Sequence, residues 1–220
     1  MAVTLEDVKN NPVIDSFIRK SNEYLGVIGY TEHGYRHVNL IASISRNILE
    51  KLEYPQRYAE LAAIAGYLHD IGNVINRKDH GISGGIIAHS ILTEMGMPPD
   101  ETALVISAIG NHDEQYGQTV NCVTAALIIA DKSDVHRSRV RNPDYATFDI
   151  HDRVNYAVEH SFLWVEEDKR TITMELTIDI DICTVMDYFE IFLSRMVLCR
   201  RASDFLKCKF ELVINGAKLV

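Results

Sequence analysis

Several motifs that identify common enzyme classes are absent from this sequence of 220 residues. It contains no GxxxxGK[ST] or GxGxxG phosphate-binding loop, no HExxH zinc motif and no GxSxG nucleophile motif. P-loop nucleotidases, dinucleotide-binding dehydrogenases, zincin proteases and serine hydrolases of the nucleophile-elbow type are therefore not supported. Whatever chemistry the chain performs must rest on another arrangement of residues.

Long apolar runs and paired cysteines are also missing. No stretch of 18 apolar residues occurs, which argues against a transmembrane helix. The first residues carry acids and no apolar segment, so we expect no secretory signal and a cytoplasmic protein. None of the four cysteines forms a CxxC pair, so zinc ribbons and thioredoxin-like motifs are not supported. Reduced thiols are the simpler interpretation.

Positive charge is in short supply. Lys and Arg number 22 against 31 Asp and Glu, which gives a formal net charge of −9. This balance argues against a nucleic-acid duplex as partner. A small anionic substrate stays compatible with it, because a single site can be locally positive. With 47% hydrophobic and 24% charged residues, the composition is that of an ordinary globular protein.

The chain up to about residue 160 has helical patterning, and we expect a helical domain over residues 1–160. Apolar residues recur at helical spacing between short breaks at proline and glycine. The expected helices are 15–26, a segment from Thr31 to about residue 49, a segment after Pro55 up to Asp70, 80–95, 100–110 and 122–134.

From residue 161, apolar residues recur at every second position instead of at helical spacing. Apolar residues at 172, 174, 176, 178 and 180 alternate with polar ones, which predicts a strand, and residues 166–169 form the turn of a hairpin that begins with strand 162–165. An amphipathic helix from Val185 and a strand 209–214 follow. We expect a small ββαβ appendage over residues 161–220, with Trp164 in its core. It suits either a homodimer interface or a lid over a substrate.

Histidine and aspartate residues recur where apolar helices end. His69 and Asp70 end the apolar segment LAAIAGYLHDIGN, where an ionised carboxylate is costly unless it is paired or coordinated. The same reasoning singles out four further candidate ligands: His37, His80, His112 and Asp131. His89 competes with His80, but nine residues of helix place the two on opposite faces, and we choose His80.

The order His, His-Asp, His, His, Asp resembles the HD-domain metal-dependent phosphohydrolases over roughly residues 30–140. The resemblance implies a mainly α protein, an HD-domain helical bundle that here carries the C-terminal ββαβ appendage. It also implies that His37, His69, Asp70 and Asp131 bind one metal ion. His80 and His112 match the two extra histidines of the dinuclear members, so two ions are implied. The Gly-Tyr-Pro segment of the cyclic-di-GMP-hydrolysing branch is absent after His112.

Imidazole and carboxylate ligands suit divalent Mn, Fe, Zn or Ni, and the ligands do not distinguish among them. Asp70 is the natural bridge, since one carboxylate reaches two ions. The resemblance implies an enzyme that cleaves a phosphate ester of a nucleotide or another small phosphorylated molecule with a metal-activated water. We assign catalytic roles to Asp70, His69 and Lys132.

Basic residues follow Asp131 closely in this acidic chain. Lys132, Arg137, Arg139 and Arg141, with His136, form either a phosphate-binding segment or a solvated charge run. Lys132 and Arg137 are the nearest to the ligand, so we predict that they bind substrate, Arg137 through its guanidinium. His33 lies one helical turn before His37, and it either contacts substrate or holds a carboxylate such as Glu32.

Two other functions stay open on the same ligands. Some proteins that resemble this pattern hold mixed-valent di-iron and are oxygenases. Alternatively, the metals are structural and the chain is a non-catalytic regulatory module. Asp113 and Glu114 orient His112 or form a polar helix end.

Overall fold

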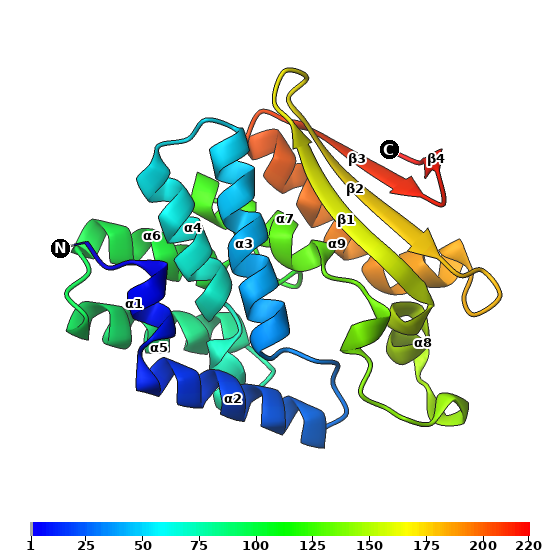
Figure 1. The fold of residues 1–220 in the computed structure, drawn as a ribbon, viewed down its shortest axis with the longest axis horizontal. Helices are drawn as coiled ribbons and strands as arrows, with labels where there is room; N and C mark the ends of the chain where they lie inside the picture. Colours follow the sequence, from blue (N-terminus) through cyan, green and yellow to red (C-terminus); the bar gives the residue numbers. More distant parts are fainter. Residues whose placement is uncertain (1) are drawn as a thin grey trace.

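The computed structural model describes residues 2–220 and confirms a mainly helical protein with a small C-terminal sheet. Figure 1 shows the helical body at one side and the strands at the other. The helices are α1 (Leu5–Lys9), α2 (Pro12–Val27), α3 (Tyr35–Lys51), α4 (Gln56–Leu68), α5 (His80–Glu94), α6 (Pro99–Gly110), α7 (Cys122–Ser133), α8 (Ile150–Ala157) and α9 (Val185–Phe205). Short 3-10 turns are η1 (Ile71–Val74), η2 (Arg137–Arg139) and η3 (Tyr145–Thr147).

The sheet follows the predicted ββαβ order and adds a short fourth strand. Its strands are β1 (Val158–Glu166), β2 (Thr171–Ile178), β3 (Lys209–Ile214) and β4 (Ala217–Lys218), in the spatial order β1-β2-β3-β4. β1 and β2 form an antiparallel hairpin, whereas β2 and β3 are parallel and are connected through α9. A parallel pair needs such a crossover, which explains why a long helix separates the two strands.

The sheet and α9 pack directly on the helical body. α9 lies against α7, and Figure 1 shows the two helices side by side. Leu198, Ala202 and Leu206 of α9 belong to the same hydrophobic core as the helices of the body. β1 begins at Val158, before the expected boundary at residue 160. This continuous packing is what lets α9 reach the candidate site.

Two local expectations were wrong. The helix that carries His37 begins at Tyr35 rather than at Thr31, because Gly34 is its N-cap and the Glu32 carboxylate accepts a hydrogen bond from the Gly34 amide. His33 therefore lies in the loop before the helix. Trp164 is 37% exposed on the edge strand β1 and is not a core residue, whereas Tyr188 and Phe192 of α9 are buried as expected.

Close backbone contacts at two glycines bring the site-bearing segments together. A Cβ added at Gly66 of α4 would lie 2.9 Å from the backbone of Ala42 in α3, so only glycine permits this approach. A Cβ at Gly72 in η1 would lie 2.0 Å from the carbonyl oxygen of His80. These contacts set α3, α4 and the start of α5 close enough for their side chains to meet.

All four cysteines are free thiols, and three of them are buried. Over residues 2–220, no helix combines the length and the apolar character that crossing a bilayer requires.

Candidate metal centre

The six residues expected to bind metal converge on one place, although they come from five different segments. His37 lies on α3, His69 caps the C-terminus of α4, and Asp70 leads into η1. His80 starts α5, His112 follows α6, and Asp131 lies near the end of α7. His89, the rejected alternative to His80, is exposed on α5.

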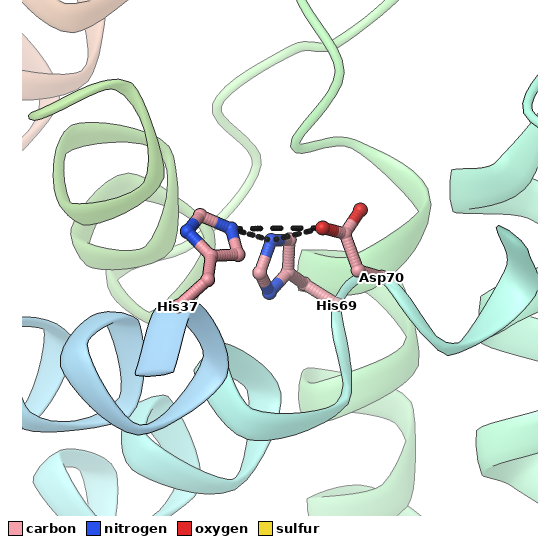
Figure 2. A group of neighbouring side chains, drawn as sticks. All are labelled: His37, His69 and Asp70. Carbon is pink, nitrogen blue, oxygen red and sulfur yellow. Dashed lines mark hydrogen bonds and ion pairs between the residues drawn. The ribbon is translucent and has the colours of Figure 1, made fainter. Parts of the chain in front are cut away.

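Four of these side chains form a compact cage. The Nε2 atoms of His37 and His69 are 3.1 Å apart, and each lies 3.3–3.6 Å from Oδ2 of Asp70. Oδ1 of Asp131 lies 3.4 Å from His37 Nε2 and 3.5 Å from His69 Nε2. Figure 2 shows His37, His69 and Asp70 directed at one another. Ligand atoms that share an ion at about 2.0–2.2 Å are separated by roughly 3.0–3.5 Å, so the cage has the dimensions of a metal site.

A second group lies on the other side of Asp70. His80 Nε2 is 3.0 Å from His112 Nε2 and 3.4 Å from Asp70 Oδ1. Asp70 thus directs one oxygen to each histidine pair. The Asn73 amide fixes this orientation by donating to Asp70 Oδ1 at 2.9 Å. Asp70, His80 and His112 form one potential ligand group, and His37, His69 and Asp70 form another.

The histidines are oriented as metal ligands are. In His69, His80 and His112, Nδ1 lies 2.8, 3.1 and 2.6 Å from the carbonyl oxygens of Gly66, Arg77 and Ile109. A carbonyl oxygen only accepts, so each Nδ1 carries the proton and each Nε2 presents a lone pair to the centre. His37 does the same through Asp134. Such a hydrogen bond on the far nitrogen is the usual support of a ligating histidine.

This arrangement requires positive charge at its centre. The Nε2 atoms of two histidine pairs lie 3.0–3.1 Å apart, which is unfavourable unless a proton or a metal ion lies between them. Asp70 Oδ2 is buried and has no hydrogen-bond partner among the described residues. Burial acts to lower the pKa of His69, but the carboxylates of Asp70 and Asp131 outweigh it and raise the pKa to about 10. Transition-metal ions fit this donor set and supply the missing charge.

Asp134 supports the centre from behind, and the sequence analysis missed it. Its carboxylate accepts the Nδ1 proton of His37 at 2.6 Å and a bidentate pair from Arg36 at 2.7 and 3.1 Å. The Asp134 side chain is only 2% exposed. Its removal would leave His37 unoriented, Arg139 without its carboxylate and Arg36 with Glu32 alone.

We therefore predict that Asp134→Ala weakens metal binding by about 10- to 100-fold, because His37 loses its fixed tautomer. The free energy of unfolding should fall by about 3 kcal/mol, the lower end for a broken buried ion pair, since Arg36 is half exposed. Metal titration and urea denaturation measure the two effects. Glu32→Gln, which removes the charge of the other carboxylate partner of Arg36 and keeps an acceptor for the Gly34 amide, is the matched control and should leave metal affinity unchanged.

A pocket of about 320 Å³ opens beside the metal centre. Asp70, His80, His112 and Asp131 form part of its wall, so the centre faces the pocket. The remaining wall comes from the loop after α2, from α8 and from α9. Its charged and polar residues outside the centre are His33, Arg77, Lys132, Arg139, Asp149, His151, Asp152, Asn155 and Arg195.

Lys132 and His33, two of the predicted substrate residues, line this pocket. The Lys132 ammonium lies 2.7 Å from Asp131 Oδ2 and 2.6 Å from Glu114 Oε2. Burial acts to lower the pKa of Lys132, but these two carboxylates outweigh it and raise the pKa. His33 donates through Nδ1 to the Thr31 carbonyl, and its ring packs edge-on against that of His37.

Arg137, the third predicted substrate residue, does not line the pocket. Its guanidinium contacts Glu159 at 3.0 Å and stacks over the Tyr156 ring. Arg139 is at the pocket wall, but it donates to the carbonyls of Asp134 and Glu32 and so holds the loop. Arg137 and Arg139 therefore mainly stabilise the loop after α7.

From this placement we expect Arg137→Ala to change kcat/KM by less than about twofold, as for a half-exposed ion pair. The comparison uses whichever substrate the wild-type protein turns over, with metal content checked in both proteins. A tenfold or greater loss of kcat/KM would mean that Arg137 does bind substrate.

Arg77 and Arg195 are pocket cations that the sequence analysis missed. Arg77 lies between η1 and α5, with Nη1 3.6 Å from Asp70 Oδ1 and 3.4 Å from Asn73 Oδ1. Arg195 comes from α9, far along the chain. Arg77 was identifiable only from its position three residues before His80, and nothing in the local sequence marks Arg195. Glu114, for which orienting His112 and forming a polar helix end were the two alternatives, pairs with Lys132 and Arg195.

The chain is similar to known proteins in sequence and in fold. The HD domain family profile matches residues 34–191, well over half of the chain. An uncharacterized protein of Methanocaldococcus jannaschii is 24% identical over 196 residues, which cover 78% of this chain and 74% of that protein. The crystal structure of a predicted HD superfamily hydrolase from an uncultured Thermotogales bacterium shares 23% identity, with a TM-score of 0.44, over 56% of this chain and 67% of that one.

A histidine and aspartate cluster assembled from successive helices, with each imidazole held by its Nδ1, defines a metal-binding helical protein. The chain belongs to the HD-domain family. The adjacent pair that gives the family its name is His69-Asp70 in this sequence.

Proposed function

We propose that this protein is a metal-dependent phosphohydrolase that uses two divalent transition-metal ions to cleave the phosphate ester of a small molecule. The observation that carries the proposal is the position of Asp70 between two histidine pairs, with one oxygen directed at each. A single ion in the first cage would not use His80, whose ligand group contains only Asp70 and His112.

One ion would be held by His37, His69, Asp70 and Asp131, and the other by Asp70, His80 and His112. The second set offers only three protein ligand atoms, which leaves room for water or substrate. When bound, such a pair of ions lowers the pKa of a bridging water and stabilises charge on the phosphoryl oxygens.

The pocket beside the centre supports a small phosphorylated substrate. Its volume of about 320 Å³ lies at the lower end of the range for small-molecule sites, roughly 300–1,000 Å³. Arg77, Lys132 and Arg195 place positive charge in the wall next to the metal ligands. In a chain of net charge −9 this local concentration attracts an anion.

Other residues of the chain would orient the metal ligands, balance the charge of Asp131 and keep part of the pocket wall apolar. Asn73 holds Asp70 in its bridging orientation, and Asp134 holds His37. Lys132 binds Oδ2 of Asp131, whereas the other oxygen, Oδ1, faces the centre. Phe192 forms an apolar part of the pocket wall.

The test is a metal-reconstitution assay on the full chain. The protein stripped with chelator and reloaded with Mn²⁺, Fe²⁺, Zn²⁺ or Ni²⁺ is screened against phosphate monoesters, with released phosphate and dissolved oxygen followed together. The proposal expects phosphate release that depends on metal and consumes no oxygen. Oxygen consumption by the iron form would instead indicate an oxygenase, and two bound ions without turnover in any form would indicate a regulatory module.

A further inference from the structure

Arg195 brings an arginine from the C-terminal part of the chain to the metal-centre pocket. It lies on α9 with Phe192 one turn before it, and both residues line the pocket. The Phe192 ring packs 4.5 Å from the Arg195 guanidinium carbon, which fixes the direction of the long side chain. The Arg195 side chain is 21% exposed, so its accessible part opens into the pocket.

A row of alternating charges connects Arg195 to the centre. Asp131, a candidate metal ligand, lies 2.7 Å from the Lys132 ammonium, and Lys132 lies 2.6 Å from Glu114. The other oxygen of Glu114 accepts a hydrogen bond from Arg195 Nε at 2.9 Å. All four side chains are largely buried. The row places Arg195 next to the ligand shell, although it is remote in sequence.

Lys132 and Arg195 differ in how many of their hydrogen-bond donors are already in use. The Lys132 ammonium is held by two carboxylates, so most of its charge is already neutralised. Arg195 uses only Nε for Glu114, and no described residue of the chain accepts a hydrogen bond from its Nη1 or Nη2. Two parallel N–H groups of a guanidinium match two oxygens of a phosphate, which a lysine cannot do.

We propose that Arg195 binds the phosphate group of the substrate through its two Nη atoms, with Glu114 as the residue that positions it. The inference rests on the proposed function and extends it: α9, the helix of the C-terminal appendage, completes the active site. The ligand class is a phosphate oxyanion in contact with both the metal centre and Arg195.

Carboxylates line the same pocket as these cations, so an anion is best held by a cation whose donors are not all already paired. Asp70, Asp131, Asp149 and Asp152 all line it, and each repels an incoming anion. Arg77 is already directed at Asp70 and Asn73, and Arg139 at backbone carbonyls. Arg195 is therefore the pocket cation with the most unused hydrogen-bonding capacity.

The experiment measures binding of inorganic phosphate to the Mn²⁺-loaded protein by isothermal titration calorimetry. Arg195→Gln is compared with Arg195→Lys and with Arg200→Gln, which removes an exposed arginine from the same helix. We expect Arg195→Gln to bind phosphate at least about tenfold more weakly, Arg195→Lys to recover part of the loss, and Arg200→Gln to match the wild type. Metal content should be the same in all four proteins.

Equal phosphate affinity in Arg195→Gln and the wild type would overturn the inference, as would a wild-type protein that binds no phosphate. If Arg195→Gln does not fold, Glu114→Gln takes its place, and it should weaken phosphate binding at unchanged metal content. The readout separates this inference from the proposed function. Phosphate binding that depends on Arg195, without hydrolysis of any ester, would retain the anion site and reject the phosphohydrolase.

Discussion

Asp70→Ala should remove both bound metal ions and lower phosphohydrolase activity by at least about a thousandfold. Asp70 is the one side chain whose two oxygens face both histidine pairs, so its loss takes a ligand from each ion. Loss of Lewis-acid stabilisation worth about 4 kcal/mol corresponds to that factor. Metal analysis of the purified variant and steady-state kinetics measure the two effects.

The fold should survive this substitution. Asp70 contributes no apolar packing to the core, so the substitution removes only its ion pairs with the neighbouring histidines and Arg77 and the hydrogen bond from Asn73. We expect a folded, helical protein whose melting temperature does not rise when Mn²⁺ is added. Full metal occupancy in Asp70→Ala would reject Asp70 as the bridging ligand.

Removing either histidine of the second pair should reduce the metal content from two ions to one. His80→Ala or His112→Ala leaves only two ligand atoms in that group, whereas the first group keeps all four of its own. Activity should fall by at least about a hundredfold, because one ion no longer clamps both reacting oxygens.

His89→Ala is the matched control for this experiment, because His89 lies on the same helix as His80 but is exposed. It should retain two ions and full activity. A stoichiometry of two in both His80→Ala and His112→Ala would mean that the second ion is held by other residues.

The ligand positions could be predicted because each is set by local sequence. His69 and Asp70 end an apolar helix, and the chain order of histidines and aspartates matches a known pattern. Strand β2 could also be predicted. Apolar and polar residues alternate at positions 172–178 because β2 packs its apolar side chains into a cluster with α9. For the strand, the period of the sequence is enough to orient the side chains, whereas the candidate ligands were chosen by residue type and by the resemblance.

The supporting residues could not be predicted, because their partners are distant in sequence. Arg195 meets Glu114 across 81 residues, and Asp134 meets His37 across 97. Arg137 was assigned to substrate because it follows Asp131 closely, yet the chain turns away after α7 and directs it to Glu159. Once a helix has ended, closeness in sequence to a ligand no longer predicts closeness in space to the site.

Helix boundaries failed for a related reason. Thr31 and Glu32 have the residue types of a helix start, but the Glu32 carboxylate bonds to the Gly34 amide and the Asn22 side chain accepts from the His33 amide. These contacts hold residues 31–34 as a loop. As a result, His33 reaches the pocket from outside the helix.

Anomalous X-ray scattering from crystals of the Mn²⁺-loaded protein tests the central claim most directly. The account predicts two peaks per chain on either side of the Asp70 carboxylate, one beside Nε2 of His37 and His69 and the other beside Nε2 of His80 and His112. A single peak, with His80 and His112 turned away from it, would contradict the dinuclear centre.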